Sequence, residues 1–261
     1  MHIVNRILSL VGAKVNRAEK IDWRVHQQYR SVLQGLRRHP PARFPTVLRY
    51  FEHDAGDHPE SYADWECSFC ASHIRRVQPG RILDIGSYRG FILGLLGHYS
   101  VTTVDVRDRA PVAGNETVIT CDAKKLAIPD GEFDAVTSLC ALEHFGLGRY
   151  GDELDLGADR QAFSEMIRVL APGGRLIFTT MIRNGEPILA FNAHRVYTYD
   201  LIAALVSPLV CEEEQILCRG GSEFRSVEEY LGSPSQSDSS SWDVYCGCWV
   251  KDQAEVDSTF R

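Results

Sequence analysis

Between residues 81 and 180 the chain alternates short apolar runs with helical patterns, and this alternation limits the fold more than any other feature. Each apolar run has the length of a buried strand, and the segments between them repeat apolar residues at helical spacing. Strands alternating with helices form a parallel sheet that is covered on both faces, with right-handed crossovers. We therefore predict an α/β fold with a Rossmann-like doubly wound sheet. The predicted strands are residues 81–85, 101–105, 117–120, 133–139 and 175–180, and the predicted helices are residues 61–77, 91–99 and 160–170.

Two more apolar runs, residues 210–217 and 242–250, bring the predicted sheet to seven strands. No clear crossover helix joins them, which allows the last strand to insert antiparallel into an otherwise mostly parallel sheet. The segment between them, residues 231–241, is rich in Ser, Gly and Pro and is predicted to be a flexible connection. We place the Rossmann-like domain at residues 59–251. A mostly helical extension is predicted before it at residues 1–58, and a C-terminal tail after it at residues 252–261.

The charge and the cysteines limit the class of partner and the compartment. A net charge of -7 argues against nucleic-acid binding and favours a small-molecule partner. The eight cysteines are scattered through predicted helices and strands, which indicates a reducing, cytoplasmic protein without a disulfide framework. Cys67 and Cys70 have the spacing of metal ligands, but Cys246 and Cys248 are one residue short of a second such pair. No metal site is therefore predicted.

The N-terminal segment is apolar but does not predict a membrane span. The apolar run within residues 1–17 is too short to cross a bilayer and is interrupted by Asn5 and Arg6. It could form an amphipathic helix that rests on a membrane or on a partner. Packing against its own domain is the favoured interpretation.

The turn after the first predicted strand carries the strongest sign of a ligand. In the segment RILDIGSYRGFI, residues 81–92, Asp84, Gly86 and Gly90 follow a short apolar run. A strand that enters a glycine turn and then a helix presents backbone N–H groups to a ligand. Because ligands of open α/β sheets bind beyond the carboxyl ends of the strands, the other strand ends belong to the same site.

Acidic residues stand at the ends of the next two strands. Asp105 ends the second strand, where a carboxylate can accept hydrogen bonds from both ribose hydroxyls. Asp122 follows the third strand and is suited to accept a hydrogen bond from an adenine amino group. Taken with the first turn alone, these features also allow a dinucleotide.

The turn RVLAPGGR, residues 168–175, precedes the fifth strand and completes a recognisable order of motifs. This order resembles that of the class I S-adenosylmethionine-dependent methyltransferases, over about residues 61–250. The resemblance implies S-adenosyl-L-methionine as the cofactor and methyl transfer as the activity. Within that superfamily the chain resembles the methyltransferase-like domain of unknown function 268 family. The segments that carry this finer resemblance are residues 84–87, 102–107, 142–152 and 191–197.

The resemblance also implies which residues contact the cofactor. It places Asp84 and Gly86 at the methionine end, Asp105 at the ribose, and Asp122 at the adenine edge. One departure is Tyr88, which stands where the family has a third glycine. Either the loop takes another path or cofactor affinity is weak, because a side chain stands where backbone should approach the cofactor. The implied cofactor-binding residues are Asp84, Gly86, Ser87, Gly90, Asp105, Val106, Asp122, Ala123 and Leu142.

Methyl transfer from a sulfonium depends mainly on holding the acceptor in line with the methyl carbon, which can contribute ~7–11 kcal/mol. A hydroxyl or amine acceptor must also lose a proton, and a histidine after the fourth strand is suited to take it. We predict His144 as the general base and His194 as a second candidate. The alternative is that His144 caps a helix or braces a loop.

The acceptor is predicted to be a small polar metabolite or a saccharide. Hydrogen-bonding side chains between residues 192 and 197 suit a hydroxyl-rich or anionic molecule, and the glycine-rich segment 146–157 is either a substrate lid or a surface excursion. Asp152 and Asp155 in this segment, together with Asp159 just after it, carry only a weak signal for a divalent cation. The predicted substrate-binding residues are Glu143, Arg149, Tyr150, Asn192, Arg195 and Tyr197.

Two other functions compete with methyl transfer. A nicotinamide-dependent oxidoreductase is disfavoured because the first turn is not G-x-G-x-x-G and no Tyr and Lys pair has the usual reductase spacing. A non-catalytic scaffold that keeps the cofactor fold and assists a partner enzyme is suggested by Tyr88 and by the long N-terminal extension.

Overall fold

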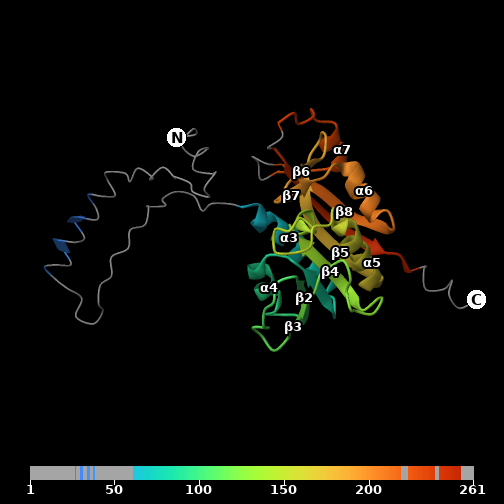
Figure 1. Cartoon of the computed structure of the whole chain (residues 1–261), viewed down its shortest axis with the longest axis horizontal. Coiled ribbons are helices and arrows are strands. Elements are labelled where there is room, and N and C mark those ends of the chain that lie inside the picture. Colours follow the sequence, from blue (N-terminus) through green and yellow to red (C-terminus); the bar gives the residue numbers. More distant parts are fainter. Residues whose placement is uncertain are drawn as a thin grey trace, which may run out of the picture. The chain divides into compact units, whose positions relative to one another are not determined.

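The computed structural model describes residues 61–218, 223–238 and 241–253, together with six helical positions between residues 27 and 38. Residues 60–261 form a compact unit separate from residues 1–59, and Figure 1 shows its elements. Of the predicted helical extension, only those six positions are described. The segment that was considered for contact with a membrane, residues 1–17, lies entirely outside the described residues. None of the helices in the described part of the chain has the length and apolar character needed to span a bilayer.

The central sheet has eight strands in the order β3-β2-β1-β4-β5-β10-β8-β9. Strands β1 to β5 are parallel, and β10 inserts antiparallel between β5 and β8. Strand order reverses between β1 and β4, which is where an open α/β sheet binds its ligand. The strands are β1 (Ile82–Ile85), β2 (Val101–Asp105), β3 (Glu116–Thr120), β4 (Phe133–Leu139), β5 (Leu170–Ile182), β8 (Leu209–Leu217), β9 (Phe224–Arg225) and β10 (Asp243–Lys251).

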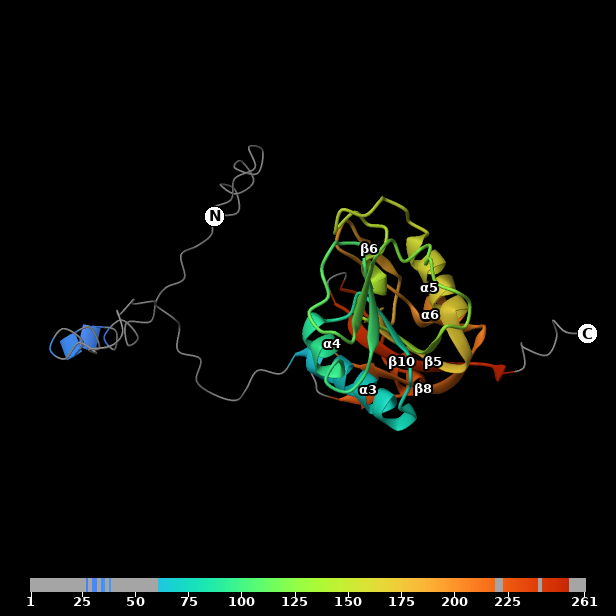
Figure 2. The same ribbon diagram turned by 90° about the horizontal axis from the view of Figure 1, so that it is seen from below.

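Helices cover both faces of the sheet, as a doubly wound fold requires (Figure 2). On one face, α3 (Tyr62–Val77) and α4 (Arg89–Leu95) pack against the sheet. On the other face lie α5 (Ala158–Val169) and α6 (Tyr199–Val206). Burial of each large apolar side chain in these two layers contributes about 1.5–3 kcal/mol to folding. The two apolar layers therefore hold the helices against the faces of the sheet. The carboxyl ends of β1 to β4 lie at the edge of these layers, where a pocket can form.

The residues at the two ends of helix α3 explain where this helix begins and ends. Ser61 precedes it, and the Asp64 carboxylate accepts a hydrogen bond from the Ser61 N–H at 2.8 Å. An acidic residue in the first turn also suits the positive end of the helix. The helix ends at Val77. The next residue, Gln78, has a left-handed backbone (φ 47°) and is followed directly by Pro79 and Gly80.

The predicted doubly wound α/β fold with an antiparallel last strand is confirmed. The predicted count of seven strands is one short, because the two-residue strand β9 pairs with the end of β8. Five further elements were not predicted from the sequence. They are the hairpin of β6 (Ile188–Ala190) and β7 (His194–Val196), the 3-10 helix Leu142–His144, helix α6, and the short helix α7 (Val227–Leu231).

In the segment predicted to be a flexible connection, the described residues 232–238 that follow α7 have no regular structure, but hydrogen bonds attach them to the chain just after β5. The Asn184 side chain donates to the Ser233 carbonyl at 2.8 Å, and the Gln236 N–H donates to the Asn184 carbonyl. The Gln236 side chain then donates to Asp243, at the start of β10, at 2.7 Å. The connection thus guides the chain into the last strand.

Candidate active site

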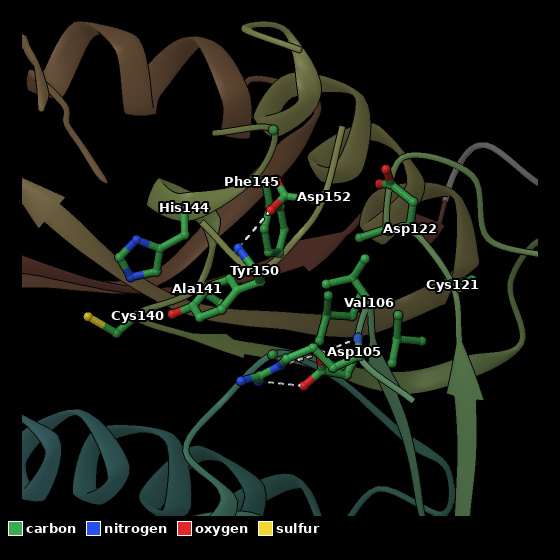
Figure 3. A pocket seen from close by; sticks show the side chains of 16 residues that line it. Asp105, Val106, Cys121, Asp122, Cys140, Ala141, His144, Phe145, Tyr150 and Asp152 are labelled. Carbon is green, nitrogen blue, oxygen red and sulfur yellow. Dashed lines mark hydrogen bonds and ion pairs between the residues drawn. The ribbon is translucent and has the colours of Figure 1, made fainter. Parts of the chain in front are cut away.

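A pocket lies at the carboxyl ends of β1, β2, β3 and β4, and Figure 3 shows it from close by. Its volume is about 90 Å³, well below the 300–1,000 Å³ of usual ligand pockets. Five predicted cofactor residues line it, namely Gly86, Asp105, Val106, Asp122 and Ala123. Other lining residues that the sequence did not indicate are Arg107, Cys121, Cys140, Ala141 and Phe145.

The turn after β1 brings bare backbone to the pocket wall. Gly86 has φ 74°, and a Cβ atom at this position would lie 3.0 Å from the Ala141 Cβ. A side chain is therefore excluded both by the left-handed backbone and by the neighbouring residue. This close approach is what a strand-turn-helix motif needs in order to hold a cofactor.

The predicted cofactor residues Asp84 and Ser87 do not line this pocket, but with Gly86 and Asp105 they line an adjoining cavity of about 340 Å³. The Asp84 carboxylate accepts hydrogen bonds from Thr137 Oγ1 at 2.8 Å and from the Ser87 N–H at 3.3 Å. Burial raises the pKa of Asp84 to about 6. Ser87 Oγ accepts a hydrogen bond from the Leu139 N–H at 2.9 Å and so ties the turn to the end of β4.

Two other predicted cofactor residues, Gly90 and Leu142, also lie outside the pocket lining. Gly90 is in α4 with open space around it, and Leu142 is buried in the core at the start of the 3-10 helix Leu142–His144. Tyr88, the departure from the family pattern, is not among the lining residues either. It precedes α4 with its hydroxyl toward Glu66 and Cys140, so the side chain turns away from the pocket.

The predicted ribose ligand, Asp105, is paired with Arg107. The Asp105 carboxylate accepts hydrogen bonds from the Arg107 N–H at 2.9 Å, from Nε at 3.0 Å and from Nη2 at 2.8 Å. The same guanidinium lies 4.8 Å from the ring centroid of Tyr150. Burial would raise the pKa of Asp105, but the hydrogen bonds and charge of Arg107 together lower it. Arg107 thus lines the pocket and forms hydrogen bonds with the carboxylate that was predicted to bind the ribose.

We expect Arg107→Ala to bind S-adenosylhomocysteine up to about fivefold more tightly than the wild type. The Arg107 side chain is 60% exposed, and exposed ion pairs contribute at most about 1 kcal/mol, which is the competition that the substitution removes. Calorimetric titration measures the change. Arg81→Ala is the matched control, because Arg81 pairs with Glu132 and Asp134 at the opposite end of the sheet. Weaker binding by Arg107→Ala would show instead that Arg107 contacts the cofactor.

His144 forms part of the wall next to Ala141 and Tyr150 (Figure 3). Its Nδ1 lies 2.6 Å from the Ala193 carbonyl oxygen. A carbonyl oxygen only accepts, so Nδ1 carries the proton and Nε2 is the nitrogen that can take another. Nε2 lies 3.8 Å from Glu143 Oε1, and Glu143 Oε2 accepts a hydrogen bond from Thr180 Oγ1 at 2.9 Å. The imidazole is therefore oriented from both sides, as a general base requires.

Two predicted acceptor residues, Arg195 and Tyr197, have a different environment from the one predicted. Both are buried, and their polar atoms bind neighbouring parts of the chain. Arg195 donates to the Phe145 carbonyl at 2.6 Å and to the Leu156 carbonyl at 3.2 Å, in the loop that follows the 3-10 helix. The Tyr197 hydroxyl donates to Asp159, in the first turn of α5, at 2.9 Å. Arg195 thus holds the loop and Tyr197 the start of α5, and neither lines the pocket.

Of the other predicted acceptor residues, Glu143, Arg149 and Asn192 do not line the pocket, and Glu143 is fully buried beside His144. Tyr150 lines the pocket, and Arg149 donates to the Ala193 carbonyl at 3.2 Å. The ring centroid of His194 is 6.4 Å from that of His144. Burial and the nearby His144 lower the pKa of His194. Asn192 is exposed in the turn of the β6–β7 hairpin.

The three aspartates considered as cation ligands form hydrogen bonds within the glycine-rich loop and at the start of α5. Asp152 accepts hydrogen bonds from the backbone N–H groups of Gly148 and Tyr150. Asp155 accepts one from the Gly157 N–H at 2.8 Å, and Asp159 binds Tyr197. They are therefore structural ligands of the loop and not a shared cation site.

A buried acid lies beneath the pocket. Glu66, on α3, is fully buried, and neither of its oxygens has a hydrogen bond of normal geometry. Burial, together with the charge of Glu143, raises the pKa of Glu66 to about 7, and the groups that face it are Tyr88, Cys140 and Thr179. Sequence reasoning missed this residue, because an acid within an amphipathic helix gives no sign that it points inward.

This acid makes stability depend on pH. Between pH 4.5 and about 7 the unfolded chain loses the proton that folded Glu66 keeps, so the free energy of unfolding falls as pH rises through that window. Glu66→Gln removes this penalty. We expect its stability relative to the wild type to rise by up to about 3 kcal/mol from pH 4.5 to pH 8. Urea unfolding at several pH values measures the difference. Glu153→Gln, at an 85% exposed side chain, should show no such trend, and a constant difference for Glu66→Gln would contradict the account.

Comparison with known proteins agrees with this geometry. Residues 83–178 match the methyltransferase domain family. Among curated proteins, the ubiquinone/menaquinone biosynthesis C-methyltransferase UbiE of Ectopseudomonas mendocina is 35% identical over 131 residues, which cover 44% of this chain and 47% of that protein. The UbiE of Pseudomonas fluorescens is 29% identical over 156 residues, covering 52% and 57%. The chain thus spans about half the length of these curated relatives.

Solved structures share the fold at low sequence identity. The 1,6-didemethyltoxoflavin-N1-methyltransferase of Burkholderia thailandensis, with bound 1,6-didemethyltoxoflavin and S-adenosylhomocysteine, is 16% identical with a TM-score of 0.53, covering 92% of this chain and 94% of that chain. The [4+2]-cyclase SpnF is also 16% identical, with a TM-score of 0.54 and coverage of 87% and 95%. These two structures show the fold that the described domain shares, and the residues that match the methyltransferase domain family run from β1 to β5.

Proposed function

We propose that the protein transfers a methyl group from S-adenosylmethionine to an oxygen or nitrogen of a small polar molecule, for example a saccharide. The observation that carries this proposal is that one pocket joins Asp105 and Asp122 to the oriented histidine His144. A base suits an O–H or N–H acceptor, because both must lose a proton during methylation. Fold alone does not decide the chemistry, since a cyclase shares it.

The residues of the pocket fit the cofactor. Gly86 provides the close backbone approach for the methionine end, since a Cβ would collide with Ala141. Asp105 is placed to accept hydrogen bonds from the ribose hydroxyls once Arg107 leaves it, and Asp122 with Ala123 borders the adenine position. When bound, the cofactor supplies an activated methyl group on a positively charged sulfur. The chain's own task is to hold the acceptor in line with that group.

Proton removal falls to His144 in this proposal. Nε2 takes the acceptor's proton, while the Nδ1–H bond to Ala193 keeps the ring in place. The carboxylate of Glu143 stabilises the imidazolium that results, because its Oε1 has no hydrogen-bond partner and lies 3.8 Å from Nε2. The proton can then leave through the pocket mouth.

The acceptor class is supported by the hydrogen-bonding groups near His144. Tyr150 lines the pocket, and Asn192 and His194 lie on either side of Ala193, whose carbonyl binds His144, whereas Arg195 is engaged by the loop. This favours a hydroxyl-rich acceptor over a strongly anionic one. The resemblance to the domain of unknown function 268 family belongs to the same proposal, because three of its segments, residues 84–87, 102–107 and 142–152, contribute lining residues to the pocket.

The proposal is tested by incubating the protein with S-adenosylmethionine that carries a deuterated methyl group and with extracts of small metabolites. Mass spectrometry should find a product that carries the label. A protein that binds S-adenosylhomocysteine but labels nothing, in any extract, would favour the non-catalytic scaffold. A response to NAD without one to S-adenosylhomocysteine would favour the oxidoreductase.

A further inference from the structure

A second group of chemically active side chains lies away from the pocket, between α3 and the antiparallel strands β8 and β10. One nitrogen of His73, one carboxylate oxygen of Glu212 and the sulfur of Cys248 all lie within 4.8 Å of one another. His73 and Cys248 are fully buried, and Glu212 is partly buried. Each comes from a different element, so the group joins a helix to two strands.

His73 has no hydrogen-bond partner despite full burial, at either ring nitrogen. Nδ1 lies 3.7 Å from Glu212 Oε1, and Nε2 lies 3.4 Å from Glu213 Oε2. Buried polar groups without partners are rare in proteins and need an explanation. The distance of Nδ1 from Glu212 is too long for a hydrogen bond. It matches the separation of two ligands on one tetrahedral ion, about 3.3 to 3.8 Å for bonds of about 2.0 to 2.3 Å.

A β-bulge brings the two carboxylates to the same histidine. Cys248 pairs with Glu213, but the next residue, Trp249, pairs with Cys211, so Glu212 is an extra residue in β8. In a regular strand, Glu212 and Glu213 would point to opposite faces. Here both face His73, one at each ring nitrogen. Bulges commonly redirect side chains in this way at functional sites.

The surrounding charges leave one oxygen of Glu212 available. Arg175 Nε donates to Glu212 Oε2 at 2.9 Å, which holds the carboxylate in position. Arg76 Nη1 lies 3.6 Å from Oε1, but this side chain is 53% exposed and can turn to solvent. Glu213 is placed to accept a hydrogen bond from the second ring nitrogen. A carboxylate in that role is the usual support of a metal-binding histidine.

We propose that His73 Nδ1, Glu212 Oε1 and Cys248 Sγ bind a divalent transition metal of the zinc type, with Glu213 as the support of His73. Thiolate, imidazole and carboxylate are the ligands that zinc takes in proteins, and water can complete a tetrahedral set. The ion would fasten α3 to β8 and β10. This proposal is independent of the proposed methyl transfer, because these residues do not line the pocket.

The test is a cobalt(II) titration of the full chain after treatment with a chelator, together with metal analysis of protein purified without one. We expect about one bound ion per chain and the visible absorption of tetrahedral cobalt with a thiolate charge-transfer band. Cys248→Ser should lose the charge-transfer band, and His73→Ala should weaken binding at least tenfold. Cys246→Ser is the matched control, because Cys246 is also buried and lies two residues earlier in the same strand.

A measurement on the wild type tests the proposal even if a variant fails to fold. Zinc should raise the melting temperature of the chelator-treated wild type in a concentration-dependent way, since an ion that binds only the folded state stabilises it. No cobalt spectrum and no zinc effect in the wild type would overturn the proposal. So would loss of the charge-transfer band in Cys246→Ser but not in Cys248→Ser. Binding of S-adenosylhomocysteine, measured in the same samples, reports separately on the pocket.

Discussion

Replacing His144 with alanine is expected to lower the turnover of methyl transfer by about 100- to 10,000-fold, the range that a positioned acid–base group contributes. The reason is geometric. Nδ1 is bound to the Ala193 carbonyl, so Nε2 alone can take a proton, and Glu143 lies beside it to stabilise the charge. Turnover is measured with labelled S-adenosylmethionine and the acceptor that the extract experiment identifies.

Controls separate this role from that of a structural brace. His194→Ala is the matched variant, because that ring is 6.4 Å away and does not line the pocket. Its turnover should stay within about tenfold of the wild type. Added imidazole should partly restore His144→Ala, whose affinity for S-adenosylhomocysteine should remain close to that of the wild type. Full turnover by His144→Ala would show that the histidine only holds the loop.

The second large effect concerns the cofactor. We expect Asp105→Ala to weaken binding of S-adenosylhomocysteine at least 100-fold, because two hydrogen bonds from ribose to a carboxylate are lost. Hydrogen bonds to charged groups contribute about 1.5–3 kcal/mol each, and every 1.4 kcal/mol is a factor of about ten in affinity. Calorimetric titration measures the change directly.

The matched control for this prediction is Asp130→Ala, which removes an exposed carboxylate paired with Arg168, remote from the pocket lining. Its affinity should not change. The signs of the Asp105 and Arg107 variants should also differ, since one removes the ligand of the ribose and the other removes its competitor. Unchanged affinity in Asp105→Ala would place the ribose elsewhere.

Much of the fold follows from local sequence. Predicted and observed bounds agree for the strands at 101–105 and 133–139, because both are short apolar runs that stop at polar residues or turns. The antiparallel direction of β10 was predicted from a missing crossover helix, whereas its pairing with β5 was not predicted. Strand β9 and the β6–β7 hairpin were missed, since two- and three-residue strands depend on their partners and leave no periodic pattern.

The site was predictable only at the level of strand ends. Gly86, Asp105 and Asp122 stand in the pocket because parallel strands end at a common rim. Asp84 and Ser87 stand at the same rim, but their hydrogen bonds turn them inward toward Thr137 and Leu139. The orientation of these side chains depends on hydrogen bonds to residues more than 50 positions away in the sequence. The spacing of residues within a local motif cannot predict such contacts.

Long-range contacts explain the remaining differences. Arg195 has the residue type of an anion ligand, but its partners are two carbonyls about 40 to 50 residues earlier in the chain. The group of His73, Glu212 and Cys248 likewise depends on a bulge that pairs β8 with β10. In the sequence, Cys246 and Cys248 are one residue short of the spacing of a metal-ligand pair, and the structure places Cys248 beside a histidine and a carboxylate instead.

The most direct test of the cofactor site is a crystal structure of the protein with S-adenosylhomocysteine. The ribose hydroxyls should lie within hydrogen-bond distance of the Asp105 carboxylate, the adenine should lie next to Asp122, and Arg107 should have moved off Asp105. Density for the compound in another cavity, with the Arg107–Asp105 pair intact, would contradict the assignment of this pocket.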